Sequence, residues 1–442
     1  MEAGTRGPGE RNWAAATLRA VGRRPLASAA GAGVLVVAGV WAWWSTQLWG
    51  LPDIGDPFDV AAFESVRVPE DRNAFVEYSE AGPMVYMAYQ GMGEAAPSWP
   101  TYLPVWSEAG QPWRDYVARA RPALALWRAG TEKPDALYVH PEGLSFSTGF
   151  PVSQRIRSLA QLAILEGSRL EGQGDMAGAW GWHRAALRSS RHSGRHGFQV
   201  ERLIGAAIHE EVVKAITRWA ADPRVDPSML RRALDEVIAI DGMTAPPSDA
   251  IKVEYLLFSR SRNDPAMVES LLVSKVEGVP ADWCQELPVP AVVKQPIQAA
   301  RVLAGDDRER SLRVLRLMTA NWLAQVDKPP SRRTPLARRD PPIYEPDPAA
   351  PPNSRAISPE ALARWYDSSL LARKQLAFLA HWARSIGRER GRQARLVVHL
   401  ADQTYRREHG GPPRSPSALV GPYLKELPEG YDAADDPPGA RP

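Results

Sequence analysis

The chain has 442 residues, enough for two or three domains with sizeable cores. Its formal net charge is +3, but residues 1–24 carry five arginines against two glutamates, so the residues that follow sum to zero. The body therefore lacks the basic footprint of a nucleic-acid-binding protein. A single cysteine, Cys284, excludes an intrachain disulfide and a cysteine-based metal site.

Residues 25–52 form an uncharged stretch of 28 positions. A helix needs about 20 apolar residues to cross the hydrocarbon core of a bilayer, so this stretch predicts a transmembrane helix. Its outer end is rich in tryptophan, a residue typical of the membrane interface: Trp41, Trp43, Trp44 and Trp49.

The charges on either side of this stretch predict its orientation. Five arginines precede it, while four acidic residues follow before the next basic residue. Positive residues stay on the cytoplasmic side. We therefore expect a tail of residues 1–24 in the cytoplasm, a span in the cytoplasmic (inner) membrane, and an extracytoplasmic body. A cleavable signal peptide is the alternative, but the long arginine-bearing segment and the lack of a small-residue cleavage site favour an uncleaved anchor.

Residues 53–150 are punctuated by proline, tryptophan and glycine and predict a mixed, helical lead-in. Within it we expect a helix over residues 113–129 and a β-hairpin over residues 136–148. Residues 151–327 predict a helical body. Apolar residues recur there at steps of three and four over 198–221 and 308–326, and Asp226-Pro227 is typical of the start of another helix.

Residues 160–193 contain the spacing of a helical hairpin, with Gly174-Asp175 at the turn. Small residues at Gly167, Ala179 and Ala186 would let two antiparallel helices touch, and His183 would fill the remaining space between them. This unit resembles one tetratricopeptide repeat, although Glu166 stands where that family has an apolar residue. No second copy follows it, so the resemblance implies packing against non-repeat helices.

Ten prolines fall within residues 328–359 and predict a linker, either extended or draped over the body. Residues 360–442 predict C-terminal helices that end near His409, followed by a tail. The basic segment 384–395 within them is expected to be a solvated helix face, with Glu389 diluting its charge.

Three histidines cluster in the sequence at His183, His192 and His196, and only His209 or Glu210 could join them. A metal site is one interpretation. Glycines interrupt the spacing, however, and no carboxylate or thiol stands nearby, so we favour helix-end residues that cap carbonyls or meet solvent and are stabilised, when protonated, by the helix dipole. His183 is expected to pack between helices.

No nucleophile elbow, phosphate-binding glycine loop or zinc-protease motif occurs in the sequence. We therefore assign no catalytic, cofactor-binding or metal-ligating residue and expect no cofactor. The sequence predicts a mainly α protein in which a transmembrane helix precedes an irregular helical domain.

A broader resemblance extends over residues 50–430. The segments "PDIGDPFDVAAFESVRVPEDRNAF", "WRAGTEKPDALYV" and "AITRWAADPRVDPSMLRRALDE" resemble membrane-anchored envelope proteins of planctomycete-type bacteria. The resemblance implies a single-pass protein with a helical outer domain and implies no particular activity.

Two functions remain open. The favoured one is a membrane-tethered helical module that binds a protein partner or organises the cell envelope without catalysis of its own. The alternative is an extracytoplasmic, hydrolase-like enzyme whose active-site residues come from distant parts of the chain. An open helical surface would favour the first, and a deep pocket with converging histidine and carboxylate groups the second.

Overall fold

The computed structural model describes residues 51–97, 105–145, 151–260, 305–329, 332–337, 343–344, 359–368 and 370–431, with six isolated positions between residues 31 and 42. In these residues the fold is mainly α, as predicted. The helices are α3 (Val60–Glu64), α4 (Phe75–Gln90), α5 (Gln111–Thr131), α6 (Pro151–Gln173), α7 (Met176–His192), α8 (Gln199–Ala221), α9 (Pro227–Asp241), α10 (Pro247–Arg260), α14 (Gly305–Leu323), α16 (Pro359–Ser368) and α17 (Leu370–His409). Short 3-10 turns are η1 (Glu70–Arg72), η2 (Gly93–Ala95), η3 (Pro141–Gly143) and η6 (Pro416–Leu419), and the strands are β1 (Pro335–Ala337) and β2 (Ile343–Tyr344).

The predicted transmembrane stretch 25–52 lies almost entirely outside the described residues, as does Cys284. Within the part of the chain that is described, no helix has both the length and the apolar character needed to cross a membrane.

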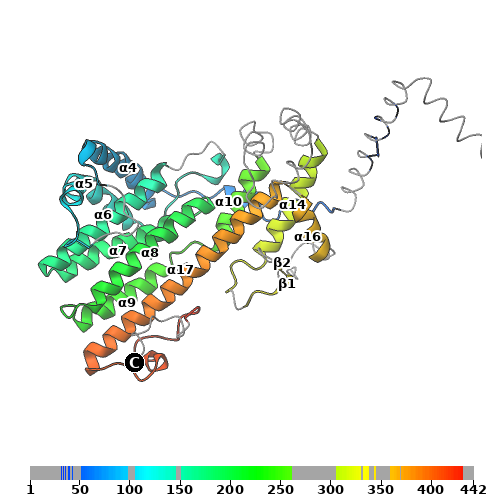
Figure 1. Cartoon of the computed structure of the whole chain (residues 1–442). Coiled ribbons are helices and arrows are strands. Elements are labelled where there is room, and N and C mark those ends of the chain that lie inside the picture. The colour runs from blue at the N-terminus through cyan, green and yellow to red at the C-terminus, as the bar shows by residue number, and fades with distance from the viewer. Residues whose placement is uncertain are drawn as a thin grey trace, which may run out of the picture.

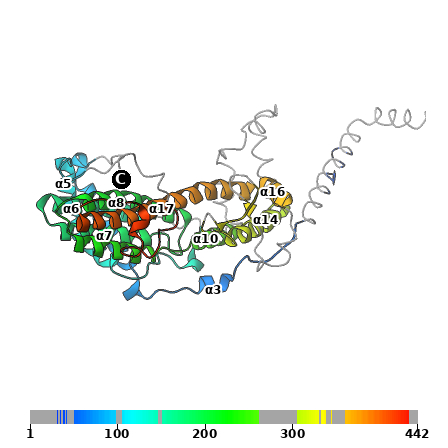
Figure 2. The ribbon, with the colours of Figure 1, turned by 90° about the horizontal axis from the view of Figure 1, so that it is seen from below.

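Two hydrophobic clusters make up the interior. The first is built from α4 to α9 and the second half of α17, and the second from α10, α14, α16 and the first half of α17. The clusters lie at opposite ends of the molecule, and α17 runs along both (Figure 1). At 40 residues α17 is about 60 Å long, so one continuous helix joins the two ends. Figure 2 shows the same arrangement from below, with α17 alongside α8.

The predicted hairpin is present as α6 and α7. Gly174 takes a left-handed conformation with φ +86°, and the Asp175 side chain accepts a hydrogen bond from Gly178 N at 2.8 Å, which caps α7. The two helices approach closely at Gly167, where a Cβ would lie 2.6 Å from Cε1 of His183. His183 is fully buried between the helices, as predicted.

Other predicted helices also appear at the expected places. Residues 199–221 form α8, and Asp226 caps α9 by accepting hydrogen bonds from Ser228 N and Met229 N. The expected β-hairpin over 136–148 is wrong for the residues described there, since 136–145 contain a 3-10 turn and no strand. A proline at the start of that turn, Pro141, is buried and leaves no backbone donor for a strand ladder.

Part of the proline-rich stretch is draped over the body, which agrees with one of the two predicted alternatives. β1 and β2 pair antiparallel there. Ile343 and Tyr344 are buried, and the Tyr344 ring meets Trp322 of α14 edge-on at 5.5 Å. Asn321 bonds both the N–H and the C=O of Tyr344, so side-chain hydrogen bonds replace the ladder that this short strand lacks on that side.

The expectation that segment 384–395 is a solvated face is wrong at Glu389. This side chain is only 2% exposed and lies between Arg191 of α7 and Arg202 of α8, with its Oε2 2.7 Å from Arg202 Nη2 and its Oε1 bonded to Arg191. Although burial alone would raise it, the two guanidinium groups lower the pKa of Glu389 to about 2. The carboxylate is therefore ionised and connects α17 to the hairpin and to α8.

A layer of polar groups extends this contact. Gln393 Oε1 accepts hydrogen bonds from Arg191 Nη2 at 3.2 Å and from His209 Nε2 at 2.9 Å. Asp241, at the end of α9, bonds Arg191 at 3.0 Å. Burial first, and then the positive charge of Arg191, lower the pKa of His209 to about 3, so this ring is neutral. These polar contacts connect four helices to one another: α7, α8, α9 and α17.

We expect Gly167→Ala to destabilise the protein by about 1–3 kcal/mol, because the added methyl group collides with the His183 ring in a packed interface. Gly172→Ala in the same helix is the matched control, since its Cβ would meet nothing within 4 Å and alanine favours helix. Urea unfolding of the full chain measures both. Equal unfolding free energies for the two variants would contradict the close approach of α6 and α7.

We expect Glu389→Gln to destabilise the protein by about 3–5 kcal/mol, because two buried guanidinium groups lose their counter-charge. Glu408→Gln is the control. Glu408 pairs with the half-exposed Arg231 at 2.7 Å, and such surface pairs contribute about 0–1 kcal/mol. Chemical unfolding of both variants at neutral pH compares the buried contact with the surface one. A decrease of less than about 1 kcal/mol in the unfolding free energy of Glu389→Gln would refute the structural role of this residue.

Candidate functional site

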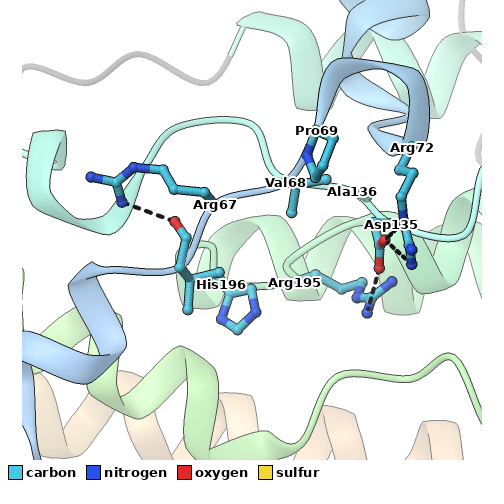
Figure 3. Close-up of a pocket in the computed structure, with 9 residues that line it drawn as sticks. Arg67, Val68, Pro69, Arg72, Asp135, Ala136, Arg195 and His196 are labelled. Atoms are coloured by element: carbon cyan, nitrogen blue, oxygen red, sulfur yellow. Dashed lines mark hydrogen bonds and ion pairs between the residues drawn. The ribbon is translucent and has the colours of Figure 1, made fainter.

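A cavity of about 360 Å³ opens where three distant segments meet. Its wall is formed by residues 66–69 and Arg72 before α4, by residues 135–136 after α5, and by residues 195–196 between α7 and α8 (Figure 3). We call it the arginine pocket, because Arg67, Arg72 and Arg195 line it with one carboxylate, Asp135, and one imidazole, His196. Its volume lies at the lower end of the range for small-molecule sites.

Backbone and side-chain hydrogen bonds join the first two segments. Asn73 receives a bond from Leu137 N and donates one to Leu137 O, both at 2.9 Å. Ala74 N donates to Asp135 O at 2.9 Å, and Asp135 N donates to Arg72 O at 3.2 Å. These bonds hold Arg72 and Asp135 side by side although 63 positions separate them in the sequence.

The third segment is a tight turn after α7. Gly194 has φ +83°, and a Cβ on it would lie 2.6 Å from the Cα of Arg202, so only glycine fits against the start of α8. His196 also has a positive φ, +48°, which is unusual for a residue with a side chain. The turn directs Arg195 and His196 into the pocket (Figure 3).

Asp135 contacts two arginines at once. Its Oδ2 accepts from Arg72 Nε at 2.9 Å, and its Oδ1 lies 3.5 Å from Arg195 Nη2. Arg195 also donates to the carbonyl of Pro134 at 2.7 Å. On the other side of the cavity Arg67 donates to the carbonyls of Glu64 and Val66 and pairs with the exposed Glu142 at 2.7 Å. The lining therefore carries more positive than negative charge.

The three clustered histidines do not converge. His183 faces Glu171 of α6, with Nε2 2.6 Å from Oε1, His192 meets the hydroxyl of Tyr78 at 2.7 Å, and His196 lies 3.2 Å from Asp249 of α10. His209 bonds Gln393 instead. Across the described part of the chain there is no group of three or more His, Cys, Asp or Glu residues placed to hold a metal ion.

The expectation that His192 meets solvent and is stabilised by protonation is wrong. The ring is fully buried under α4, and burial together with Arg188 and Arg195 lowers its pKa to about 3. His196 does lie beyond the end of α7, as predicted, but burial lowers its pKa too, despite the carboxylate of Asp249. Helices distant in sequence cover the end of the hairpin. Their presence cannot be predicted from the residues near His192 and His196 in the sequence.

The pair most similar to a catalytic dyad is Glu171 with His183. In a hydrolase the second imidazole nitrogen faces a nucleophile. Here Nδ1 of His183 faces Gly167, whose Cβ would lie 3.0 Å away, and the ring is fully buried. Arg218 also contacts Glu171, at 3.2 Å. The pair is a packing and ion-pair contact of the hairpin.

A second surface feature lies on α4. Six large hydrophobic side chains are well exposed among the described residues, and three of them, Met84, Tyr86 and Met87, fall within four positions of this helix. With the exposed Pro83 they form what we call the α4 face. The guanidinium of Arg155 from α6 stacks 5.2 Å from the Tyr86 ring, and Arg119 of α5 reaches the end of the helix near Gly91.

Comparisons with protein-family models, with curated proteins and with solved structures gave no match to this chain. Function is therefore argued from the arginine pocket and the α4 face. Sequence reasoning missed both, because Arg67, Arg72 and Asp135 carry no motif and the apolar residues of α4 are indistinguishable in sequence from core residues.

Proposed function

We propose that the protein is a helical protein-interaction module, without catalytic activity of its own, held at the cytoplasmic membrane by residues 25–52. The observation that carries the proposal is the α4 face. Met87 is 66% exposed, Tyr86 48% and Met84 40%, so one helix exposes a short strip of three large apolar side chains within four positions. Such strips are typical of surfaces that bind another protein, and methionine adapts its shape to a partner.

The charges beside the strip indicate the chemistry of the partner. Arg155 lies on the α6 side of α4 and Arg119 on the α5 side. An amphipathic helix whose apolar stripe is flanked by carboxylates would complement this surface in both hydrophobicity and charge. We therefore infer that the partner presents an acidic amphipathic helix.

The position of the α4 face agrees with a membrane tether. Leu51 is buried in the second cluster and its carbonyl accepts a bond from Arg313 of α14, while Asp53 pairs with Arg316 at 2.7 Å. The chain therefore enters the body at the α14 end, and α4 lies at the opposite end (Figure 1). A tether at residues 25–52 would leave α4 at the end of the body remote from the point of attachment.

The partner chemistry is tested with two synthetic amphipathic helices that share a leucine stripe and differ only in glutamate or lysine flanks. We expect the full-length chain to bind the glutamate peptide at least about tenfold more tightly, because opposite charges complement and like charges repel. Met87→Glu should abolish binding. Ile238→Glu, which changes another exposed hydrophobic residue, on α9, is the control and should bind as the parent does. Equal affinity for both peptides, or an unaffected Met87→Glu variant, would reject the proposal.

The tether is tested separately by topology. Protease added outside intact spheroplasts should digest residues 53–442 and spare the arginine-bearing N-terminus, because positive residues remain cytoplasmic. Mass spectrometry of the protein from membranes should recover peptides from residues 1–24. A protected body, or a mature N-terminus near Gly50, would show that residues 25–52 are not an anchor.

A further inference from the structure

We propose that the arginine pocket binds the phosphate group of a small phosphate monoester. This site is separate from the α4 face and does not depend on the function proposed for that surface. Its support is the charge of the lining, the arrangement of the guanidinium groups and the backbone strain at His196.

The charge of the lining exceeds what its own carboxylate neutralises. Three arginines line the cavity against the single carboxylate of Asp135, and the guanidinium of Arg67 extends away from the other two (Figure 3). Since Arg72 and Arg195 share Asp135, one positive charge between them has no counter-charge within the lining, and Arg67 adds a second from the opposite wall. The side chains of the lining sum to +2, and to about +1 with Glu142, which pairs with Arg67, so the pocket favours an oxyanion.

Arg67 must exchange existing contacts to reach a ligand, since its Nη1 donates to the carbonyls of Glu64 and Val66 and its Nη2 to Glu142. Its pair with Glu142 is between half-exposed side chains, 49% and 57%, and ion pairs of that kind contribute little because water screens them. By contrast Arg72 and Arg195 are oriented by Asp135 and by the Pro134 carbonyl. The pocket thus has two guanidinium groups positioned by Asp135 on one wall and a third, held by backbone carbonyls and Glu142, on the other. Planar guanidinium groups recognise phosphate through paired hydrogen bonds.

His196 supplies the independent observation. A histidine at φ +48° stores conformational strain that the surrounding structure must maintain, and such residues concentrate at functional sites. The ring is held by Asp249 at Nδ1 and by an edge-on contact with Phe63 at 5.6 Å. These contacts fix the ring of His196 at the edge of the pocket.

The size of the cavity indicates that the phosphate is carried on a larger molecule. About 360 Å³ exceeds the space of a single phosphate ion, and the apolar lining residues Val66, Val68, Pro69 and Ala136 border the remaining space. A small organic group esterified to the phosphate would contact these side chains. The ligand class is therefore a phosphate monoester of a small alcohol or sugar, or the same group on a lipid.

The experiment is isothermal titration of the full-length chain with inorganic phosphate, glycerol 3-phosphate and acetate, and co-sedimentation with vesicles that contain phosphatidic acid. We expect glycerol 3-phosphate or the vesicles to bind more tightly than inorganic phosphate, and acetate not to bind. Tighter binding of glycerol 3-phosphate assigns a soluble ester, and tighter binding of the vesicles assigns a lipid headgroup. No binding to any phosphate probe, or acetate binding as tightly as phosphate, overturns the proposal.

Two substitutions with opposite expected effects assign binding to the pocket. Arg195→Gln should weaken binding by about tenfold or more, since it removes a charged hydrogen-bond donor. Asp135→Asn should tighten binding, because it removes the competing carboxylate while keeping the shape and backbone bonds. A general loss of folding could not tighten binding. The control is Arg231→Gln, which removes an arginine that also pairs with a carboxylate, Glu408, outside the pocket. Equal affinities for Arg195→Gln and Arg231→Gln, or weaker binding by Asp135→Asn, would reject the site.

Discussion

The buried carboxylate of Glu389 is the contact on which the arrangement of the long helices depends. It comes from the middle of α17 and is enclosed by Arg191 at the end of α7 and Arg202 in the first turn of α8. Desolvating three charges is costly, so the arrangement is stable only when all three are present and their hydrogen bonds are made. That condition specifies which turn of α17 lies against the hairpin, where apolar packing alone would tolerate a shift by one turn.

The geometry of the arginine pocket depends on this alignment of α17 with α7 and α8. Arg191 and Arg202 bracket the turn at residues 193–197, so the ion pairs hold both ends of the segment that carries Arg195 and His196. Gly194 packs against the Cα of Arg202, which leaves the turn little freedom to relax. The strain at His196 is therefore maintained by contacts that stabilise the whole helical assembly, a common relation between a rigid framework and a strained functional residue.

Buried ionisable groups and surface groups play different parts in this structure. The ionisable groups of the interior, Glu171 with His183, Glu389 with its arginines, and His192 with Tyr78, have partners on other helices and are shielded from solvent. The arginines of the pocket and the apolar side chains of the α4 face are accessible to a ligand. Both are suited to binding, one by charge and the other by apolar contact. This distribution is why we infer a binding protein.

The sequence by itself determined the helical class, the start of α9 at Asp226 and the turn at Gly174, because caps, glycines and the helical period act over a few residues. It also predicted the close helix contact at Gly167 and His183, since small residues at that spacing permit it. Tertiary structure alone decided that Glu389 is buried, that His192 lies under α4, and that Arg72 and Asp135 meet Arg195. Burial and charge pairing join residues that are 198 and even 263 positions apart, and a local pattern of residue types does not record which distant helix will cover them.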